Sequence, residues 1–138
     1  MIYPAIQDWR ETGFFLSSTM QDFECIELDS VEDVSVVKFK DHKVMDPARI
    51  EILGKELLSL VDEDDQENMV INFENVSFFS SGAINKLIVL EKRVRARGGK
   101  IRLSNLRPEV RDLFSYTNLD SMFDIKDGQT EAIESLQE

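Results

Sequence analysis

The apolar positions along the chain follow two spacings, which together predict a sheet covered by helices. Short runs rich in β-branched and aromatic residues are typical of strands. Five such runs stand at residues 23–28, 34–40, 69–73, 100–104 and 121–126. Apolar residues that recur every three or four positions are typical of helices that bury one face. Four helices are expected on this basis, at residues 46–63, 82–97, 107–117 and 127–136.

Local signals mark the ends of the expected helices. Asp46 can cap the first helix, and Pro47 suits its first turn because proline has no N–H to leave unsatisfied there. Gly98-Gly99 ends the second helix, since glycine adopts the left-handed conformation common after a helix. Asn118 can end the third helix in the same way, and Asp127 is expected to cap the fourth.

The resulting order, β-β-α-β-α-β-α-β-α, predicts an α/β fold with a mixed central sheet of four to five strands packed with about four helices. The first two strands, joined by a turn at residues 30–33, prevent the sheet from being wholly parallel. One domain is expected over residues 22–138, because domains commonly contain roughly 100–150 residues. Residues 1–21 form an N-terminal extension that we expect to pack on the domain or on a neighbouring chain through its aromatic residues Trp9, Phe14 and Phe15.

Composition excludes several classes of function. The net charge of −11 and the isoelectric point near 4.5 argue against a nucleic-acid partner. The single cysteine, Cys25, cannot form an internal disulfide and fits a reducing compartment. No apolar run approaches the roughly 20 residues of a membrane span, and the N-terminus lacks the basic region of a secretory signal. We therefore expect an acidic, cytoplasmic protein.

Basic residues concentrate in one part of the chain. Residues 92–111 hold half of the sixteen lysines and arginines. The first interpretation is a solvated helix end whose cations complement the helix dipole. The second is a docking patch for an acidic partner. Nucleic acid is a poorer third, because no aromatic residues interleave with the basic ones to stack on bases.

The residues expected of an enzyme are mostly missing. The one histidine, His42, stands beside Asp41 in an expected loop. One histidine and one cysteine cannot build a zinc site, and a serine–histidine–aspartate triad would depend on that single imidazole. The phosphate-cradling motif of nucleotide-binding loops is also missing from the sequence. We expect neither an enzyme nor a cofactor.

Ser80-Ser81-Gly82 stands where a buried strand gives way to a helix, and it has two interpretations. A serine is a favoured helix cap, and in that role it contributes about 1 kcal/mol to stability. The same place also suits a phosphorylated serine, because a helix N-terminus offers free N–H donors and a positive dipole end. A phosphate adds roughly −1.5 to −2 of charge. Gly82 lets another protein approach the backbone.

The residues around this step follow a family pattern. Asn72-Phe73, Val76-Ser77-Phe78, Ser80-Ser81-Gly82 and Gly98-Gly99 occur in register with an apolar strand ending in Asp-Phe, a Val-x-Phe loop, a helix opened by Asp-Ser-Ser-Gly-Leu-Gly, and a later Gly-Gly. Asp46 stands at the place of the family's earlier loop aspartate. Over about residues 23–135 the chain resembles the STAS domain family of bacterial anti-sigma factor antagonists.

The resemblance implies a function and a site. In the family, the second serine of the pair is phosphorylated by a partner anti-sigma factor, a serine kinase with a histidine-kinase-like ATPase domain. The unphosphorylated antagonist binds that kinase and releases the sigma factor, so that transcription is regulated by partner switching. Carried over, the phosphoacceptor is Ser81, with Ser80 as second choice. The partner-binding residues implied in this way are Asp46, Phe79, Ser80, Ser81, Gly82, Asn85 and Lys86.

The chain also departs from the family pattern. Phe79 occupies the place of the aspartate before the serines, and Ala83-Ile84 replaces Leu-Gly. These departures favour an alternative: a STAS scaffold that is not phosphorylated and serves as a subunit of a signalling or lipid-transport complex, with Phe79 as an apolar contact. Nucleotide binding at the Ser-Ser-Gly loop is a third hypothesis. The sequence leaves a homodimer open.

Overall fold

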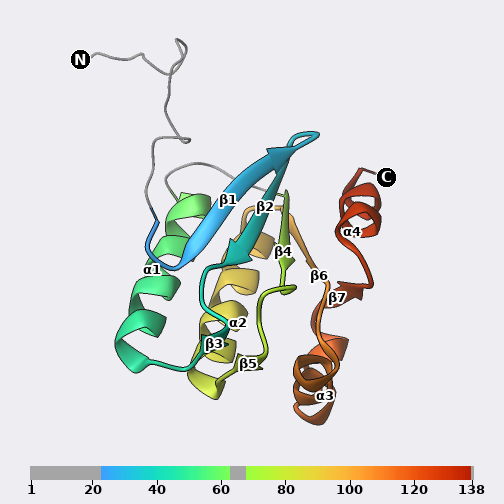
Figure 1. Cartoon of the computed structure of the whole chain (residues 1–138). Coiled ribbons are helices and arrows are strands. Elements are labelled where there is room, and N and C mark those ends of the chain that lie inside the picture. Colours follow the sequence, from blue (N-terminus) through green and yellow to red (C-terminus); the bar gives the residue numbers. More distant parts are fainter. Residues whose placement is uncertain (1–22, 63–67, 138) are drawn as a thin grey trace, which may run out of the picture.

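The computed structural model describes residues 23–62 and 68–137, which form a five-stranded mixed sheet with helices on both faces (Figure 1). The strands run in the spatial order β1-β2-β4-β6-β7; β1 is antiparallel to β2, and each later neighbour is parallel. This arrangement confirms the expected mixed α/β sheet. The strands of this sheet are β1 Ile26–Val31, β2 Val34–Phe39, β4 Asn68–Asn72, β6 Lys100–Ser104 and β7 Asp124–Lys126.

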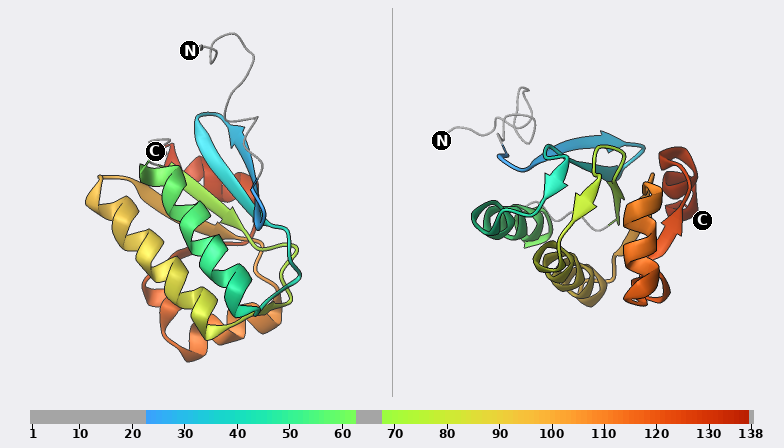
Figure 2. Two further views of the ribbon diagram at one scale, coloured as in Figure 1. Left: turned by 90° about the vertical axis from the view of Figure 1, so that its left-hand side faces the viewer. Right: turned by 60° about the horizontal axis from the view of Figure 1, so that its bottom comes forward.

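Helices cover the two faces of the sheet unequally. The helices are α1 Pro47–Asp62, α2 Ser81–Ala96, α3 Pro108–Tyr116, the short 3-10 helix η2 Leu119–Ser121, and α4 Gln129–Leu136. Helices α1 and α2 lie side by side on one face, with α4 on the other (Figure 2). The larger core fills the α1 and α2 side, and a smaller one joins Val36, Val70 and Ile133 beneath α4.

A second, two-stranded sheet was not expected from the sequence. Strands β3 Lys43–Val44 and β5 Phe78–Phe79 pair in parallel, with Lys43 opposite Phe78 and Val44 opposite Phe79. Two residues are too few for a hydrophobic period to be visible, so only the structure reveals this pairing. Val44 and Phe79 face the core, whereas Lys43 and Phe78 are exposed. The small sheet leads directly into α1 and α2.

Several boundary predictions were wrong. The last strand, expected at residues 121–126, occupies only Asp124–Lys126, because Leu119–Ser121 forms the 3-10 helix η2. The first strand occupies Ile26–Val31 rather than residues 23–28, and the turn expected at 30–33 contracts to Glu32 and Asp33. Both turn residues have positive φ, 52° and 68°, which is the conformation of a tight two-residue hairpin and lets pairing continue to Val31 opposite Val34. The last helix is capped by Gly128, not Asp127, and without a side-chain hydrogen bond.

Other end signals are confirmed. The Ala48 N–H donates to Oδ1 of Asp46 at 3.4 Å, as a helix cap requires. Gly98 (φ 82°) and Asn118 (φ 61°) adopt the left-handed conformation after α2 and α3. The N-terminal extension, including Trp9, Phe14 and Phe15, lies outside the described residues, as does the last residue of the first expected helix, Glu63.

Four phenylalanines form an aromatic cluster in the core, and one of them, Phe79, directly precedes the cap of α2. The ring centroids of Phe39 and Phe73 lie 5.0 Å apart, and that of Phe79 lies 5.4 Å from Phe39 and 5.2 Å from Phe73. The Phe114 ring of α3 stands 5.9 Å from Phe73 in an edge-on arrangement. Such tilted and edge-on contacts are favourable between aromatic rings. They join the small sheet to the main core.

Candidate partner-binding site

The start of α2 is held by Ser80, which occupies the cap position with φ −75° and ψ 166°. Its Oγ accepts a hydrogen bond from the N–H of Ala83 at 3.3 Å. Its own N–H donates to the carbonyl oxygen of Val44 in β3 at 3.0 Å. Ser80 therefore performs the capping role that one interpretation gave to the serine pair, and it ties the helix to the small sheet.

Ser81, the first residue of α2, presents its side chain to the outside. It is exposed, and its hydroxyl makes no hydrogen bond to any residue in the described part of the chain. Gly82 beside it is also exposed. A Cβ placed on Gly82 would meet Ile50 Cδ1 at 3.7 Å and Ser80 Oγ at 3.8 Å, which are ordinary contacts. Internal packing therefore does not require glycine at this position.

The prediction that Phe79 contacts a partner is wrong. Its side chain is only 1% exposed and lies in the aromatic cluster, so it cannot be the apolar partner contact that the sequence suggested. Alternation along β5 turns Phe78 outward instead, with 47% exposure. Reading Phe78 and Phe79 as an alternating pair would have found the exposed ring.

Two apolar side chains stand exposed on this end of the molecule. Met45, which is 54% exposed, directly follows β3. Phe78 is the first residue of β5, the strand that pairs with β3. Ser80 bonds to Val44, the residue before Met45, so the serine pair lies beside the same small sheet. We name the surface formed by Met45, Asp46, Phe78, Ser81 and Gly82 the entry face, since it surrounds the beginnings of α1 and α2.

The remaining expected site residues divide into two groups. Asp46 is exposed where α1 begins, and Asn85 is exposed one turn into α2. Lys86 instead reaches across to α1, where Nζ lies 3.1 Å from Oε2 of Glu51. Its stem packs over Gly54, at which an added Cβ would stand 2.7 Å from Lys86 Cδ. Lys86 therefore joins the two helices and is only 24% exposed at its side chain.

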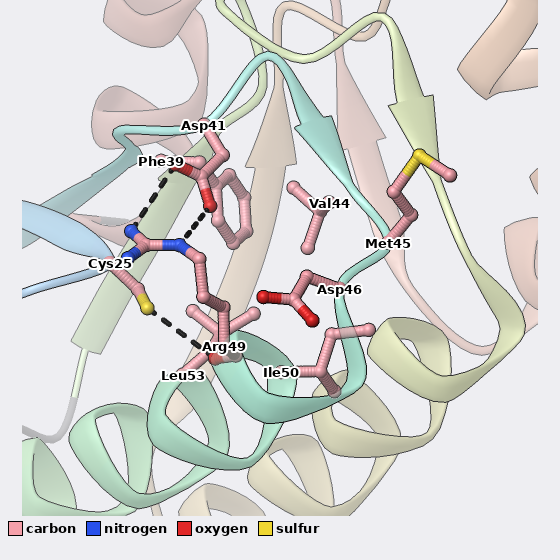
Figure 3. A pocket seen from close by; sticks show the side chains of 9 residues that line it. All are labelled: Cys25, Phe39, Asp41, Val44, Met45, Asp46, Arg49, Ile50 and Leu53. Carbon is pink, nitrogen blue, oxygen red and sulfur yellow. Dashed lines mark hydrogen bonds and ion pairs between the residues drawn. The ribbon is translucent and has the colours of Figure 1, made fainter.

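A small pocket beside the entry face has a structural role (Figure 3). Its space of about 10 Å³ is no more than one water requires. Arg49 lines the pocket and donates two hydrogen bonds to Asp41, from Nε to Oδ2 at 2.7 Å and from Nη2 to Oδ1 at 3.2 Å. This hydrogen bonding raises the pKa of the Arg49 guanidinium. Burial raises the pKa of the Cys25 thiol, whose Sγ donates to the Arg49 carbonyl at 3.4 Å. The thiol is therefore protonated and unsuited to nucleophilic chemistry.

Several basic residues within 92–111 form ion pairs with acidic residues of the same chain. Arg93 pairs with Asp62, and Arg95 pairs with Glu91 one turn earlier; this bond also raises the pKa of the Arg95 guanidinium. Such pairs support the interpretation of this region as a solvated helix end.

Other chemistry has no support in the parts of the chain that the structure describes. His42 lies exposed in a loop, with Nδ1 2.8 Å from the carbonyl oxygen of Asn75, as its position in the sequence predicted. Within residues 23–62 and 68–137, no three potential ligands from histidine, cysteine, aspartate and glutamate gather as a metal site. None of the helices described there has the length and apolar content needed to cross a membrane.

Comparisons with known proteins agree on one family. Residues 26–132 match the family model described as STAS domain. A Bordetella bronchiseptica protein provisionally described as anti-sigma factor antagonist BtrV is 26% identical over 89 residues, covering 64% of this chain and 76% of that protein.

Solved structures show the same fold. An anti-sigma-factor antagonist (STAS) domain protein from Planctomyces limnophilus superposes with a TM-score of 0.74 at 20% identity, covering 82% of this chain and 98% of that one. The phosphorylated form of the Bacillus cell fate determinant SpoIIAA superposes with a TM-score of 0.62 at 20% identity, covering 80% and 97%.

Proposed function

The chain belongs to the STAS domain family, and on this premise we propose that it is a cytoplasmic, non-enzymatic anti-sigma factor antagonist that regulates transcription by partner switching. The relative with that description supports the proposal, as do the antagonists that share the fold. One observation carries it: an exposed serine at the start of α2 stands beside two exposed apolar side chains. The partner is an anti-sigma factor that is also a serine kinase with a histidine-kinase-like ATPase domain.

The entry face supplies what such a partner needs for binding. Met45 and Phe78 offer apolar area, and buried apolar or aromatic anchors usually carry most of the energy of an interface. Gly82 has no side chain, so a partner can approach the backbone at this position. Packing within the chain would accept a side chain there. Asp46 adds a charged group at the margin, where charge acts chiefly on orientation and association rate.

Phosphorylation of Ser81 is the proposed control. Its hydroxyl is exposed and makes no hydrogen bond within the described residues, so a kinase meets no bond that it must first break. At the first position of a helix, a phosphate is stabilised by the dipole and by free N–H groups. The fold therefore tolerates the modification, while roughly −1.5 to −2 of added charge disrupts an apolar contact beside it.

The test uses the anti-sigma factor kinase with ATP, followed by intact mass and peptide mapping. We expect one phosphate, lost in Ser81→Ala and retained in Ser80→Ala if that variant stays folded by circular dichroism. Binding to the kinase without ATP should be retained by Ser81→Ala. A kinase that phosphorylates another antagonist but leaves this protein unmodified would refute phosphorylation while leaving the binding role open.

A second candidate is the unphosphorylated scaffold, and the position of Phe79 favours it. A residue 1% exposed among phenylalanine rings is no place for the aspartate of the family pattern. The cap, where aspartate and serine are both preferred, is Ser80. If Ser80 takes the place of the acid, the serine pair of the pattern falls on Ser81 and Gly82, and the second hydroxyl is missing. The protein would then bind its partner without a phosphorylation switch.

Gly82→Ser separates the two candidates. The modest contacts around Gly82 indicate that the variant folds. If the second candidate is right, the kinase leaves the parent protein unmodified and phosphorylates Gly82→Ser at the new side chain. If the first is right, the parent is phosphorylated at Ser81.

A further inference from the structure

Strand β7 forms an open edge of the main sheet. Among the residues that the structure describes, Asp124–Lys126 pair with β6 only, and Figure 1 shows β7 at the margin of the sheet between α3 and α4. Successive residues of a strand direct their N–H and C=O groups to opposite sides. At least one residue of β7 therefore presents both groups outward. An edge of this kind can pair with a strand of another chain.

A polar groove of about 540 Å³ runs beside this edge. One wall is the outer side of α3, formed by Asp112 and Ser115, while Val110 and Phe114 of the same helix face the core. The rest of the lining includes Asp120 of η2 together with Asp124 and Ile125 of β7. The groove thus borders the edge strand, and its lining includes no residue of the entry face.

The charge of the groove is unbalanced toward acid. Neither Asp112 nor Asp120 forms an ion pair or a side-chain hydrogen bond with a residue that the structure describes. Asp124 is shared by Arg102 at 3.2 Å and Lys126 at 3.4 Å. Arg111, the basic residue of the lining, is 3.7 Å from Asp127. The carboxylates of Asp112 and Asp120 therefore remain available to pair with basic side chains of another molecule.

Exposed apolar side chains stand at the margin of the groove. Tyr116 is 88% exposed and follows Asp112 by four residues, so the two share one side of α3. Met122 is 39% exposed and stands in the chain between Asp120 and Asp124. An occupant that touches this margin gains apolar area in addition to charge.

We propose that the groove beside β7 binds an extended, basic segment of a partner protein by strand addition. The outward backbone groups of β7 pair with the segment, as in other cases where a peptide adds a strand to a sheet edge. Its lysine or arginine side chains meet Asp112 and Asp120, and an apolar side chain rests against Tyr116 or Met122. This is a second docking surface, and it does not depend on the function proposed for the entry face.

The test titrates the full chain with an octapeptide of alternating lysine and valine, followed by amide NMR. We expect shifts in α3, η2 and β7. The double variant Asp112→Asn with Asp120→Asn should weaken binding by about three- to tenfold, the usual scale for two exposed ion pairs. Asp33→Asn is a control for the position of the lost charge, because it removes an acid at the hairpin between β1 and β2, where asparagine tolerates a φ of 68°. Its affinity should equal that of the parent.

A second peptide distinguishes strand addition from simple charge attraction. The same octapeptide with alternate backbone nitrogens methylated keeps its charge but cannot donate to a strand edge. We expect it to bind markedly more weakly than the parent peptide. Equal binding of the methylated peptide overturns the proposal, as do shifts confined to β1, an unchanged affinity in the double variant, or no shifts at about 1 mM peptide, a concentration at which even weak sites are seen.

Discussion

Phe79→Asp tests whether the residue before the serine pair can be an acid in this fold. Phe79 is 1% exposed and contacts the rings of Phe39 and Phe73. Truncating a buried phenylalanine alone costs about 3–5 kcal/mol. Aspartate adds the cost of burying a polar group without a partner, about 1–3 kcal/mol. Since domains of this kind unfold at about 5–15 kcal/mol, the variant should lose about a quarter or more of its stability.

The loss should depend on pH. A carboxyl group inside the aromatic cluster has a raised pKa, because burial disfavours its charged form. The native variant then binds more protons than the unfolded chain, so its stability falls as pH rises through the range between the unfolded and folded pKa values. We therefore expect Phe79→Asp to be less destabilised at about pH 4 than at about pH 7, each measured against the parent at the same pH.

Urea unfolding followed by circular dichroism measures the effect, with the m-value as a check on two-state behaviour. Phe78→Asp, at a position 47% exposed, and Ser80→Asp, at the cap, are controls that should each change stability by less than about 1 kcal/mol. The reasoning is refuted if Phe79→Asp also loses less than about 1 kcal/mol with an unchanged m-value. The acid could then stand at residue 79, and the main argument for the unphosphorylated candidate would disappear.

Three further predictions concern the binding surface, a turn and the thiol. Met45→Ala with Phe78→Ala should weaken binding to the anti-sigma factor at least tenfold in calorimetry, because truncated interface anchors each cost about 1–2 kcal/mol or more; Val89→Ala, a control at an exposed position of α2, should leave binding unchanged. Asp33→Gly should raise the midpoint of thermal unfolding, because glycine adopts the left-handed turn conformation without the steric cost that Asp33 bears at φ 68°; a lower midpoint would contradict this. Cys25 should react with a thiol reagent far more slowly in the native protein than in urea, because burial raises its pKa. Because the folded-state pKa of the thiol is raised, the stability that comes from burying the neutral thiol is present below its ordinary pKa and is lost as pH rises through the folded pKa. Equal reaction rates in the native protein and in urea would show that the thiol is open to solvent.

The long periodic segments were predictable from the sequence because each encodes its own structure. The helix at 82–97 needed only its apolar stripe and Gly98-Gly99, and the structure places it at Ser81–Ala96. The mixed sheet followed from the order of elements. The capping role of Ser80 was one of two local interpretations, and the geometry of the bond to Ala83 confirmed it.

What the sequence did not reveal depends on contacts between distant residues. Strands β3 and β5 are two residues each and exist because Val44 and Phe79 meet across a parallel pairing. The inward turn of Phe79 and the outward turn of Phe78 follow from that pairing. The groove beside β7 is different: its lining comes from one stretch, residues 111–125, but the hollow exists only once α3, η2 and β7 pack together.

The small parallel sheet has a mechanical consequence for recognition. Strand β3 runs directly into the cap of α1 and β5 into the cap of α2, and the Ser80–Val44 bond joins them. The paired strands therefore hold the first turns of α1 and α2 in fixed positions relative to each other before any partner binds. A protein that docks there orders little new backbone, so the conformational entropy lost on association is small. Association should then proceed at the about 10⁵–10⁷ M⁻¹s⁻¹ typical of rigid surfaces, without a slow rearrangement phase.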